Sequence, residues 1–195
     1  MRRPASASSA GRAGAAARRN CVRIIAGKWR SRLVKFPPAI ALRPTPDRVR
    51  ETLFNWLGQR LDGLACLDLF AGSGALGFEA LSRGAARVVM VERERAVARQ
   101  LRDSARDLGA QAEVIESDAL DYLERTPDRF DLAFVDPPFA TNLAVRALAL
   151  LPRSLQPGAR VYVESAERLD PGPAWHVLRE DRAGAVRYAL YEFRP

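Results

Sequence analysis

Histidine and cysteine are almost missing from this chain of 195 residues, which contains one histidine, His176, and two cysteines, Cys21 and Cys66. The cysteines are far apart and have no CxxC spacing, so the sequence offers neither a disulfide framework nor a set of zinc ligands. One histidine near the end of the chain is also a poor general base for a serine or cysteine nucleophile. We therefore expect no metal and no covalent catalysis.

Long apolar runs are missing as well. None approaches the roughly 20 residues that a membrane-spanning helix needs, and the first residues lack the apolar stretch of a secretory signal. Residues 1–20 are instead rich in Ala, Ser, Arg and Gly, a composition that a disordered basic arm shares with an organelle transit peptide. We favour the disordered arm, and expect a cytoplasmic protein with no membrane partner.

Acidic residues are missing from the first 46 positions. Residues 1–50 contain 13 basic residues and one acidic residue, whereas residues 51–195 contain 18 basic and 22 acidic residues. A GC-rich genome would explain 29 arginines against two lysines, but it would not explain the missing acids. Because Lys and Arg neutralise phosphates and release counterions, this uneven charge predicts a nucleic-acid partner for the N-terminal part.

The first apolar pattern, over residues 22–36, alternates around Gly27 and Lys28, which predicts a small β-hairpin. Basic side chains interleaved with an aromatic can hold phosphates and stack a base, although Trp29 would equally suit packing on the protein body. The candidate RNA-binding residues in this part of the chain are Arg23, Lys28, Trp29, Arg30, Arg32, Arg43 and Arg48.

A helix should follow the hairpin. We expect Thr45 to be its N-cap, Pro46 its first residue and Gly58 to mark its end. Its apolar face would dock on the body and leave Arg48 and Arg50 available.

From Leu64 onward, apolar strand patterns alternate with helical ones, which indicates an open parallel sheet with helices on both faces. We expect a closing β-hairpin in the tail, at 174–179 and 185–193. The expected strands are 64–70, 86–91, 111–115, 130–135 and 158–164, and the expected helices are 74–83, 94–108, 118–125 and 141–151. The predicted division is an arm at 1–20, a hairpin and helix at 21–60 and the main domain at 61–195.

A glycine-rich loop, Gly72-Ser73-Gly74-Ala75-Leu76-Gly77, follows the first of these strands. Glycines here allow backbone amides and a helix N-terminus to approach a nucleotide-like ligand. The pattern is also the GxGxxG of dinucleotide-binding proteins, which is weak evidence alone. Asp68, at the strand end, would repel a pyrophosphate but can balance the ammonium group of an aminoacyl-type cofactor.

Two further acids end the next strands. Glu92 is placed to accept both ribose hydroxyls, a feature that dehydrogenases share. Asp118 can accept from an adenine amino group, but Ser117 or Asp118 would serve equally well as a helix N-cap.

The tetrapeptide Asp136-Pro137-Pro138-Phe139 closes the strand at 130–135. An exocyclic amine on a nucleobase is a poor nucleophile because its lone pair is delocalised. Hydrogen bonds to the Asp136 carboxylate and the Pro137 carbonyl would draw that lone pair out of the ring plane. The prolines keep the backbone rigid and free of N–H donors, while Phe139 offers a stacking face. The tetrapeptide therefore predicts methylation of a base amino group.

Taken together, these motifs resemble the S-adenosylmethionine-dependent Rossmann-like methyltransferases and, within them, the RsmD-type 16S rRNA guanine-N2 methyltransferases. The most family-specific segment is Leu42-Arg43-Pro44-Thr45-Pro46-Asp47-Arg48-Val49-Arg50-Glu51-Thr52-Leu53-Phe54-Asn55-Trp56-Leu57. The resemblance covers residues 22–195, and the basic extension before it departs from the family's usual short start.

The resemblance implies an α/β fold with a seven-stranded, mostly parallel sheet whose last strand is antiparallel. It implies S-adenosylmethionine as cofactor, a substrate pocket at Asp136, Pro137, Pro138 and Phe139, and cofactor contacts from Asp68, Phe70, Gly72, Gly74, Glu92, Asp118, Ala119 and Asp136. The implied partner is 16S rRNA in an assembled or partly assembled small ribosomal subunit, and we expect a monomer.

Three alternatives stay open at this point. An adenine-N6 methyltransferase of DNA or RNA uses the same tetrapeptide, although the chain has no room for a separate target-recognition domain. An NAD-dependent oxidoreductase would use the glycine loop, but Asp68 and the double proline argue against it. A non-catalytic RNA-binding protein could keep the same fold.

Overall fold

The computed structural model describes residues 20–37, 45–138 and 142–195. The chain begins with a small antiparallel hairpin of β1 (Cys21–Arg23) and β2 (Leu33–Lys35), followed by helix α2 (Asp47–Trp56). The predicted hairpin is therefore present. The elements that follow are β3 (Ala65–Asp68), α3 (Ala75–Ser82), β4 (Arg87–Glu92), α4 (Arg95–Leu108), β5 (Ala112–Glu116), α5 (Ala119–Arg125), β6 (Phe130–Val135), α6 (Leu143–Leu150), the 3-10 helix η2 (Leu151–Ser154), β7 (Leu155–Ser165), β8 (Trp175–Ala183) and β9 (Val186–Phe193).

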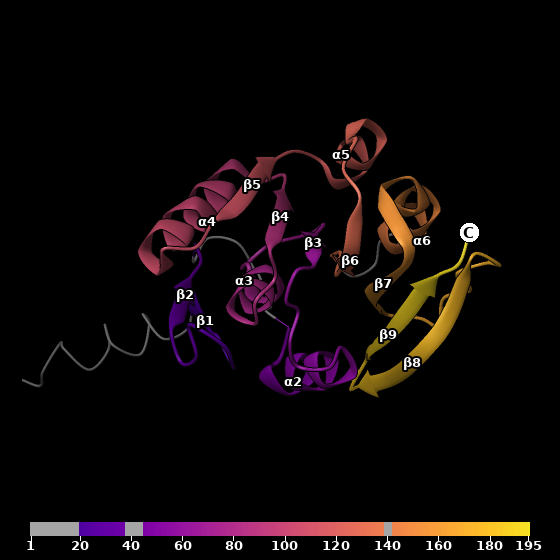
Figure 1. Cartoon of the computed structure of the whole chain (residues 1–195), viewed down its shortest axis with the longest axis horizontal. Helices are drawn as coiled ribbons and strands as arrows, with labels where there is room; N and C mark the ends of the chain where they lie inside the picture. Colours follow the sequence, from indigo (N-terminus) through magenta and orange to yellow (C-terminus); the bar gives the residue numbers. More distant parts are fainter. Residues whose placement is uncertain (1–19, 38–44, 139–141) are drawn as a thin grey trace, which may run out of the picture.

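The central sheet has seven strands in the order β5-β4-β3-β6-β7-β9-β8 (Figure 1). The first five of these are parallel, and β9 pairs antiparallel with both β7 and β8. The predicted α/β class and antiparallel last strand are confirmed. The range predicted for β7, 158–164, was too short. Pro157 and Gly158 interrupt the apolar pattern, but the strand continues through them.

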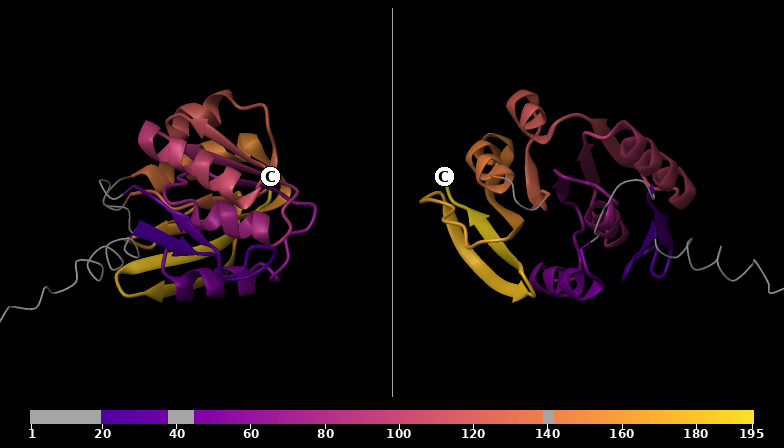
Figure 2. Two further views of the ribbon diagram at one scale, coloured as in Figure 1. Left: turned by 90° about the vertical axis from the view of Figure 1, so that its left-hand side faces the viewer. Right: turned by 180° about the vertical axis from the view of Figure 1, so that it is seen from behind.

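Helices cover both faces of this sheet (Figure 2). Alternate strand residues face alternate sides, so Cys66, Met90 and Phe134 share one core cluster with α2, α3, α4 and the first hairpin. Their neighbours Leu67 and Val89 belong to a second cluster with α5 and α6. This alternation places four strand-end carboxylates on the face covered by α2 and α3, those of Asp68, Glu92, Asp136 and Glu164.

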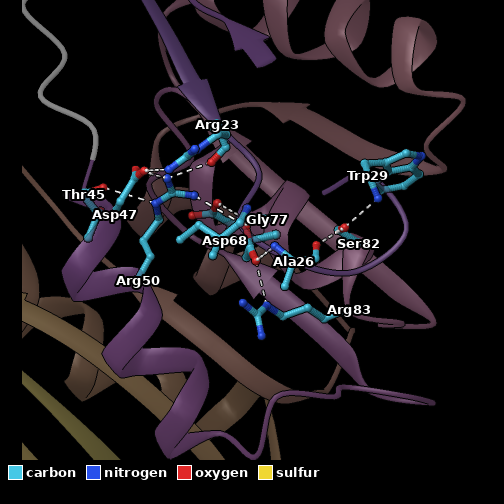
Figure 3. A network of polar contacts seen from close by, with 12 residues as sticks. Arg23, Ala26, Trp29, Thr45, Asp47, Arg50, Asp68, Gly77, Ser82 and Arg83 are labelled. Carbon is cyan, nitrogen blue, oxygen red and sulfur yellow. Dashed lines mark hydrogen bonds and ion pairs between the residues drawn. The ribbon is translucent and has the colours of Figure 1, made fainter. Parts of the chain in front are cut away.

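The first hairpin is attached to the body through Glu79, which is fully buried on α3. The Glu79 carboxylate accepts hydrogen bonds from the backbone N–H groups of Ile25, at 2.7 Å, and Ala26, at 3.0 Å. It also pairs with Arg83, at 2.7 Å, and with Arg50, at 3.6 Å (Figure 3). Arg50 has no exposed surface, so the prediction that it remains available was wrong.

The tip of the hairpin meets the far end of α3. A side chain at Gly27 would place its Cβ 1.8 Å from the carbonyl oxygen of Ser82, and only glycine fits there. The backbone N–H of Lys28 donates to that carbonyl at 2.8 Å, and the N–H of Trp29 donates to the Ser82 hydroxyl at 3.0 Å. Ser82 is the last residue of α3, so the tip lies at the end of the helix away from the carboxyl edge of the sheet.

Candidate active site

A cavity of about 270 Å³ opens at the carboxyl ends of β3, β4 and β6. Parallel α/β sheets bind their ligands at this edge. Of the residues predicted from the sequence, the cavity is lined by Asp68, Phe70, Gly72, Glu92, Asp118, Ala119, Asp136, Pro137 and Pro138. Thr45 also lines it and was not predicted to do so.

Asp68 lies at the base of this cavity with 2% of its surface exposed. One carboxylate oxygen accepts a hydrogen bond from the N–H of Gly77 at 2.9 Å. A Cβ at Gly77 would lie 2.6 Å from the Met90 side chain, so only glycine allows this backbone amide to come so close to Asp68. Burial raises the pKa of Asp68 to about 7; the Gly77 hydrogen bond opposes the rise, and the nearby charges of Asp136 and Glu92 add to it.

The two glycines of the loop that were predicted to contact the cofactor have different roles. Gly72 lines the cavity, and its N–H donates to the Glu92 carboxylate at 3.0 Å. Gly74 does not line the cavity, and its contact with the cofactor stays a prediction. It is the left-handed N-cap of α3, with φ of 75°, and a Cβ there would lie 2.6 Å from Phe78 and 2.7 Å from Leu101. Packing and backbone conformation therefore require this glycine.

Glu92 is fixed at the end of β4 by two backbone amides. Its oxygens accept from the N–H of Gly72 at 3.0 Å and from that of Glu94 at 2.8 Å. A carboxylate oxygen can accept more than one hydrogen bond, so ribose hydroxyls can still be bound. The ribose contact stays a prediction.

Asp118 is the N-cap of α5. One of its carboxylate oxygens accepts from the N–H groups of Leu120, at 2.8 Å, and Asp121, at 3.4 Å. The capping alternative is therefore confirmed for Asp118. Since the residue also lines the cavity beside Ala119, the adenine contact stays a prediction.

Thr45 is not the N-cap of α2. That position belongs to Pro46, with φ of −55° and ψ of 145°, and the helix begins at Asp47. The Thr45 hydroxyl instead donates to a carboxylate oxygen of Asp136 at 2.9 Å, which joins the helix entry to the tetrapeptide. No local signal in the sequence predicts a contact between residues 91 positions apart.

The pKa of Asp136 is raised to about 6, because burial disfavours the ionised form more than the Thr45 hydrogen bond favours it. Pro137 and Pro138 form the neighbouring wall and have no N–H groups to compete for an acceptor. Phe139 lies outside the described residues. The cavity therefore combines the carboxylates of Asp136 and Asp68 with the rigid backbone of Pro137 and Pro138.

Trp29 cannot stack a base as predicted, because its side chain packs in the core and is only 7% exposed. The alternative, in which this indole packs on the body, is the one that the structure supports. Arg43 lies outside the described residues.

The other predicted RNA-binding cations are exposed, but they are not grouped around the cavity. Lys28 and Arg30 lie beside the last residue of α3, about 12 Å of helix away from its start at the cavity. Arg32 donates to the carbonyl of Asp107 at the end of α4. Arg48, in the first turn of α2, and Arg23, paired with Asp47 at 3.2 Å, are nearer to Thr45.

No group of three His, Cys, Asp or Glu side chains in residues 20–37, 45–138 and 142–195 could hold a metal ion. None of the helices in these ranges is long and apolar enough to cross a membrane.

Comparisons with known proteins agree with this geometry. Residues 22–192 match the family described as conserved hypothetical protein 95. The ribosomal RNA small subunit methyltransferase D of Haemophilus influenzae is 46% identical over 180 residues, which cover 88% of this chain and 93% of that protein. A putative methyltransferase of Escherichia coli has a solved structure with a TM-score of 0.82 and 44% identity, covering 89% of this chain and 98% of that one.

A more distant structure shares the fold alone. It is a 16S rRNA N2 methyltransferase of Thermus thermophilus, solved in complex with AdoMet and guanosine, with 24% identity and a TM-score of 0.69. The match covers 90% of this chain and 50% of that one.

Proposed function

The chain belongs to the family described as conserved hypothetical protein 95, and we propose that it transfers a methyl group from S-adenosylmethionine to the N2 amine of one guanine in 16S ribosomal RNA. The enzyme class rests on 46% identity to a small-subunit rRNA methyltransferase over 88% of the chain. The observation that carries the proposal is the position of Asp136, whose carboxylate shares one cavity with Asp68 and Glu92.

The chemistry of this cavity suits S-adenosylmethionine. Asp68 and Asp136 are acids with raised pKa values, and among the described residues neither forms an ion pair with Arg or Lys. A ligand with a cationic ammonium and a cationic sulfonium compensates such a group of acids. When bound, S-adenosylmethionine supplies the methyl group as an electrophile.

The residues of the chain would then act on the amine. The Asp136 carboxylate and the Pro137 carbonyl would accept hydrogen bonds from the two N–H groups of the amine. These hydrogen bonds would orient the N2 lone pair toward the methyl group. The amine nitrogen would gain the bond to the methyl carbon as the carbon–sulfur bond breaks and its electron pair stays on sulfur. The amine would then be positively charged, and one of its protons would pass to Asp136 or to water. Pro137 and Pro138 hold this arrangement without offering a competing donor.

The proposal also covers the partner. The substrate would be an assembled or partly assembled small ribosomal subunit, which the protein would meet in the cytoplasm as a monomer. Arg23 and Arg48 would contact phosphates near the target guanine, and Lys28, Arg30 and Arg32 phosphates farther away.

Methyl transfer from tritiated S-adenosylmethionine would test this function. The substrates would be unmethylated small subunits, free 16S rRNA, duplex DNA and an adenine-rich RNA. We expect labelled N2-methylguanine from one site in the subunit, identified by mass spectrometry of nuclease digests. Label on adenine N6 instead would support the alternative reaction and overturn the proposal.

Binding measurements would separate the remaining alternatives. We expect S-adenosylhomocysteine to bind and NADH not to bind in calorimetry. Binding of NADH alone would favour the oxidoreductase, and binding of neither would favour a non-catalytic RNA-binding protein.

A further inference from the structure

A fully buried arginine, Arg50 of α2, has no part in the reaction described so far. Its neighbouring acid on α3, Glu79, lies 3.6 Å away and is already paired with Arg83 at 2.7 Å. The Arg50 nitrogen that faces Glu79, Nη1, forms no hydrogen bond with the described residues. Burying a cation costs free energy, and compensation of Glu79 alone does not explain a second buried arginine.

The hydrogen bonds that Arg50 does form hold the entry to α2. Its Nε donates to the carbonyl of Thr45 at 3.3 Å, and its Nη2 donates to the carbonyl of Arg23 at 2.9 Å and to the carboxylate of Asp47 at 2.6 Å (Figure 3). Thr45 precedes the N-cap, Pro46, so its carbonyl lies outside the hydrogen bonds of the helix. Because the guanidinium is planar and rigid, these contacts fix the Thr45 carbonyl relative to β1 and α2.

Thr45 transmits this restraint to the cavity. Its hydroxyl donates to Oδ2 of Asp136 at 2.9 Å. The carbonyl that Arg50 binds and the hydroxyl that Asp136 accepts belong to the same residue, whose β-branched side chain has few favourable rotamers. Fixing the main chain of Thr45 therefore fixes the direction of its hydroxyl.

The Asp136 carboxylate needs such a restraint. The last torsion of an aspartate side chain has a broad distribution, so a carboxylate at the end of a strand does not adopt one orientation by itself. Among the described residues, Thr45 is the only one whose side chain forms a hydrogen bond with this carboxylate. With Oδ2 occupied by the hydroxyl, Oδ1 is left to accept from an amine.

We propose that Arg50 is a positioning residue for methyl transfer: it holds the main chain of Thr45, and the Thr45 hydroxyl then holds the Asp136 carboxylate in the orientation that receives the target amine. This role rests on the proposed function for the identity of the amine. Arg50 does not line the cavity, so it acts on the reaction only through Thr45.

The same hydrogen bond affects the ionisation of Asp136. Burial raises the pKa of this acid to about 6, and the Thr45 hydrogen bond opposes the rise. The titratable groups on the neighbouring strands are acids or phenols, namely Asp68 of β3, Glu92 of β4, and Tyr162 and Glu164 of β7. Because these neighbours are unchanged in the variants below, loss of the Thr45 hydrogen bond should raise the pKa of Asp136 further.

Two lysine variants test the role of Arg50 through kcat on small subunits. Arg50→Lys retains the charge but not the planar set of donors, so kcat should fall by about tenfold while the KM for S-adenosylmethionine changes little. The matched control is Arg83→Lys, which disturbs the same Glu79 without contacting Thr45. It should lose melting temperature but keep the wild-type kcat. Equal losses of kcat in the two variants would overturn the proposal.

Variants of Thr45 test the next contact of the chain. Thr45→Val removes the hydroxyl and should lower kcat by about tenfold, whereas Thr45→Ser retains the donor and should recover most of that loss. The double variant Thr45→Val with Arg50→Lys should lose no more kcat than the larger single change, because both changes remove the same restraint. Losses that multiply would show that Arg50 acts by another route.

Asp47→Ala decides the question if Arg50→Lys does not fold. It removes the 2.6 Å contact of the guanidinium and leaves Glu79 paired with both arginines. The Asp47 side chain is 45% exposed, so the fold should tolerate its loss. We expect kcat to fall by about two- to threefold, and to remain unchanged in Glu51→Ala, an exposed control on the same helix. Wild-type kcat in Asp47→Ala would contradict the role of Arg50.

A titration without substrate keeps the two proposals separate. In protein labelled with carbon-13 at the aspartate carboxyls, the NMR signal of Asp136 is the one that disappears in Asp136→Asn. Its pKa should be higher in Thr45→Val and Arg50→Lys than in the wild type, and unchanged in Arg83→Lys. One pKa in all four proteins would contradict the role of Arg50 even if guanine-N2 methylation is confirmed. If the wild type does not methylate guanine N2, the proposed function fails, and the titration still decides whether Arg50 acts on Asp136.

Discussion

Two groups of buried charges lie on the same face of the sheet and differ in how they are compensated. In the second half of α3, Glu79 is paired with Arg50 and Arg83 and accepts hydrogen bonds from two backbone amides of the first hairpin. At the other end, beside the cavity, Asp68 and Asp136 have no such cation among the described residues. The first group contains its own cations, whereas the second does not among the described residues.

The first group contributes to the stability of the fold, and the second is available for a ligand. The Glu79 group joins the hairpin, α2 and α3, and removing one partner would leave a buried charge alone. Burial raises the pKa values of Asp68 and Asp136, and the nearby charges of Asp136 and Glu92 add to the rise for Asp68. A bound cation would compensate these acids. An uncompensated group of acids is a cost to the free protein, which the proposed cofactor and substrate would offset.

Replacing Asp136 should have the largest effect on activity. In Asp136→Asn the amide retains a hydrogen bond to Thr45 but cannot take a proton or hold the amine as strongly, so kcat should fall by at least about 100-fold. Calorimetry should still detect binding of S-adenosylhomocysteine, and the melting temperature should not fall. Wild-type turnover in this variant would remove Asp136 from the reaction.

Replacing Glu79 should have the largest effect on stability. In Glu79→Gln, Arg83 becomes a buried charge without a carboxylate and Arg50 retains only that of Asp47, so the free energy of unfolding should fall by about 3–5 kcal/mol. Urea denaturation followed by circular dichroism would measure it. The matched control is Glu51→Gln, an exposed position on α2, where we expect a change within about 0.5 kcal/mol. A loss below 1 kcal/mol in Glu79→Gln would show that the comparison between the two groups is wrong.

The affinity for cofactor should depend on pH through Asp68. Its pKa of about 7 in the free protein means that below pH 7 a proton must leave before a cation can bind the carboxylate. The affinity for S-adenosylhomocysteine should therefore rise with pH between 5.5 and 7, by up to about tenfold per unit, and level off above 7. Asp68→Asn should bind more weakly and lose this component of the pH dependence. The same slope in both proteins would assign the titration to another group.

The smallest effects are expected from single surface arginines and lysines. Arg48→Ala, near the cavity, should raise the KM for small subunits by a few-fold and reduce the slope of log affinity against log salt by about one. The double change Lys28→Ala and Arg30→Ala, at the far end of α3, should affect KM less, and Arg153→Ala serves as an exposed control. If the double change has the larger effect, the RNA is bound chiefly at the first hairpin.

Residues whose roles were wrongly predicted share one physical cause. Trp29 and Arg50 have a sequence context typical of an exposed basic hairpin and helix, yet both are buried, because Ser82 and Glu79 of α3 offer them partners. Thr45 has the local pattern of a helix cap, but its hydroxyl is used by Asp136. The local sequence indicates which hydrogen bonds a residue is able to form. It does not indicate which distant group will be its partner in the folded protein.

The amino-acid sequence alone predicted the parallel sheet and the order of its strand-end acids, and the family resemblance of its motifs implied the class of ligand. This was possible because strand periodicity and the position of binding sites at carboxyl edges follow from local geometry. Tertiary packing, in contrast, sets which acids are paired with cations and which are left for a ligand. The pKa values of Asp136 and Glu164 depend on desolvation and on neighbours brought together from distant parts of the chain, and no local pattern contains either.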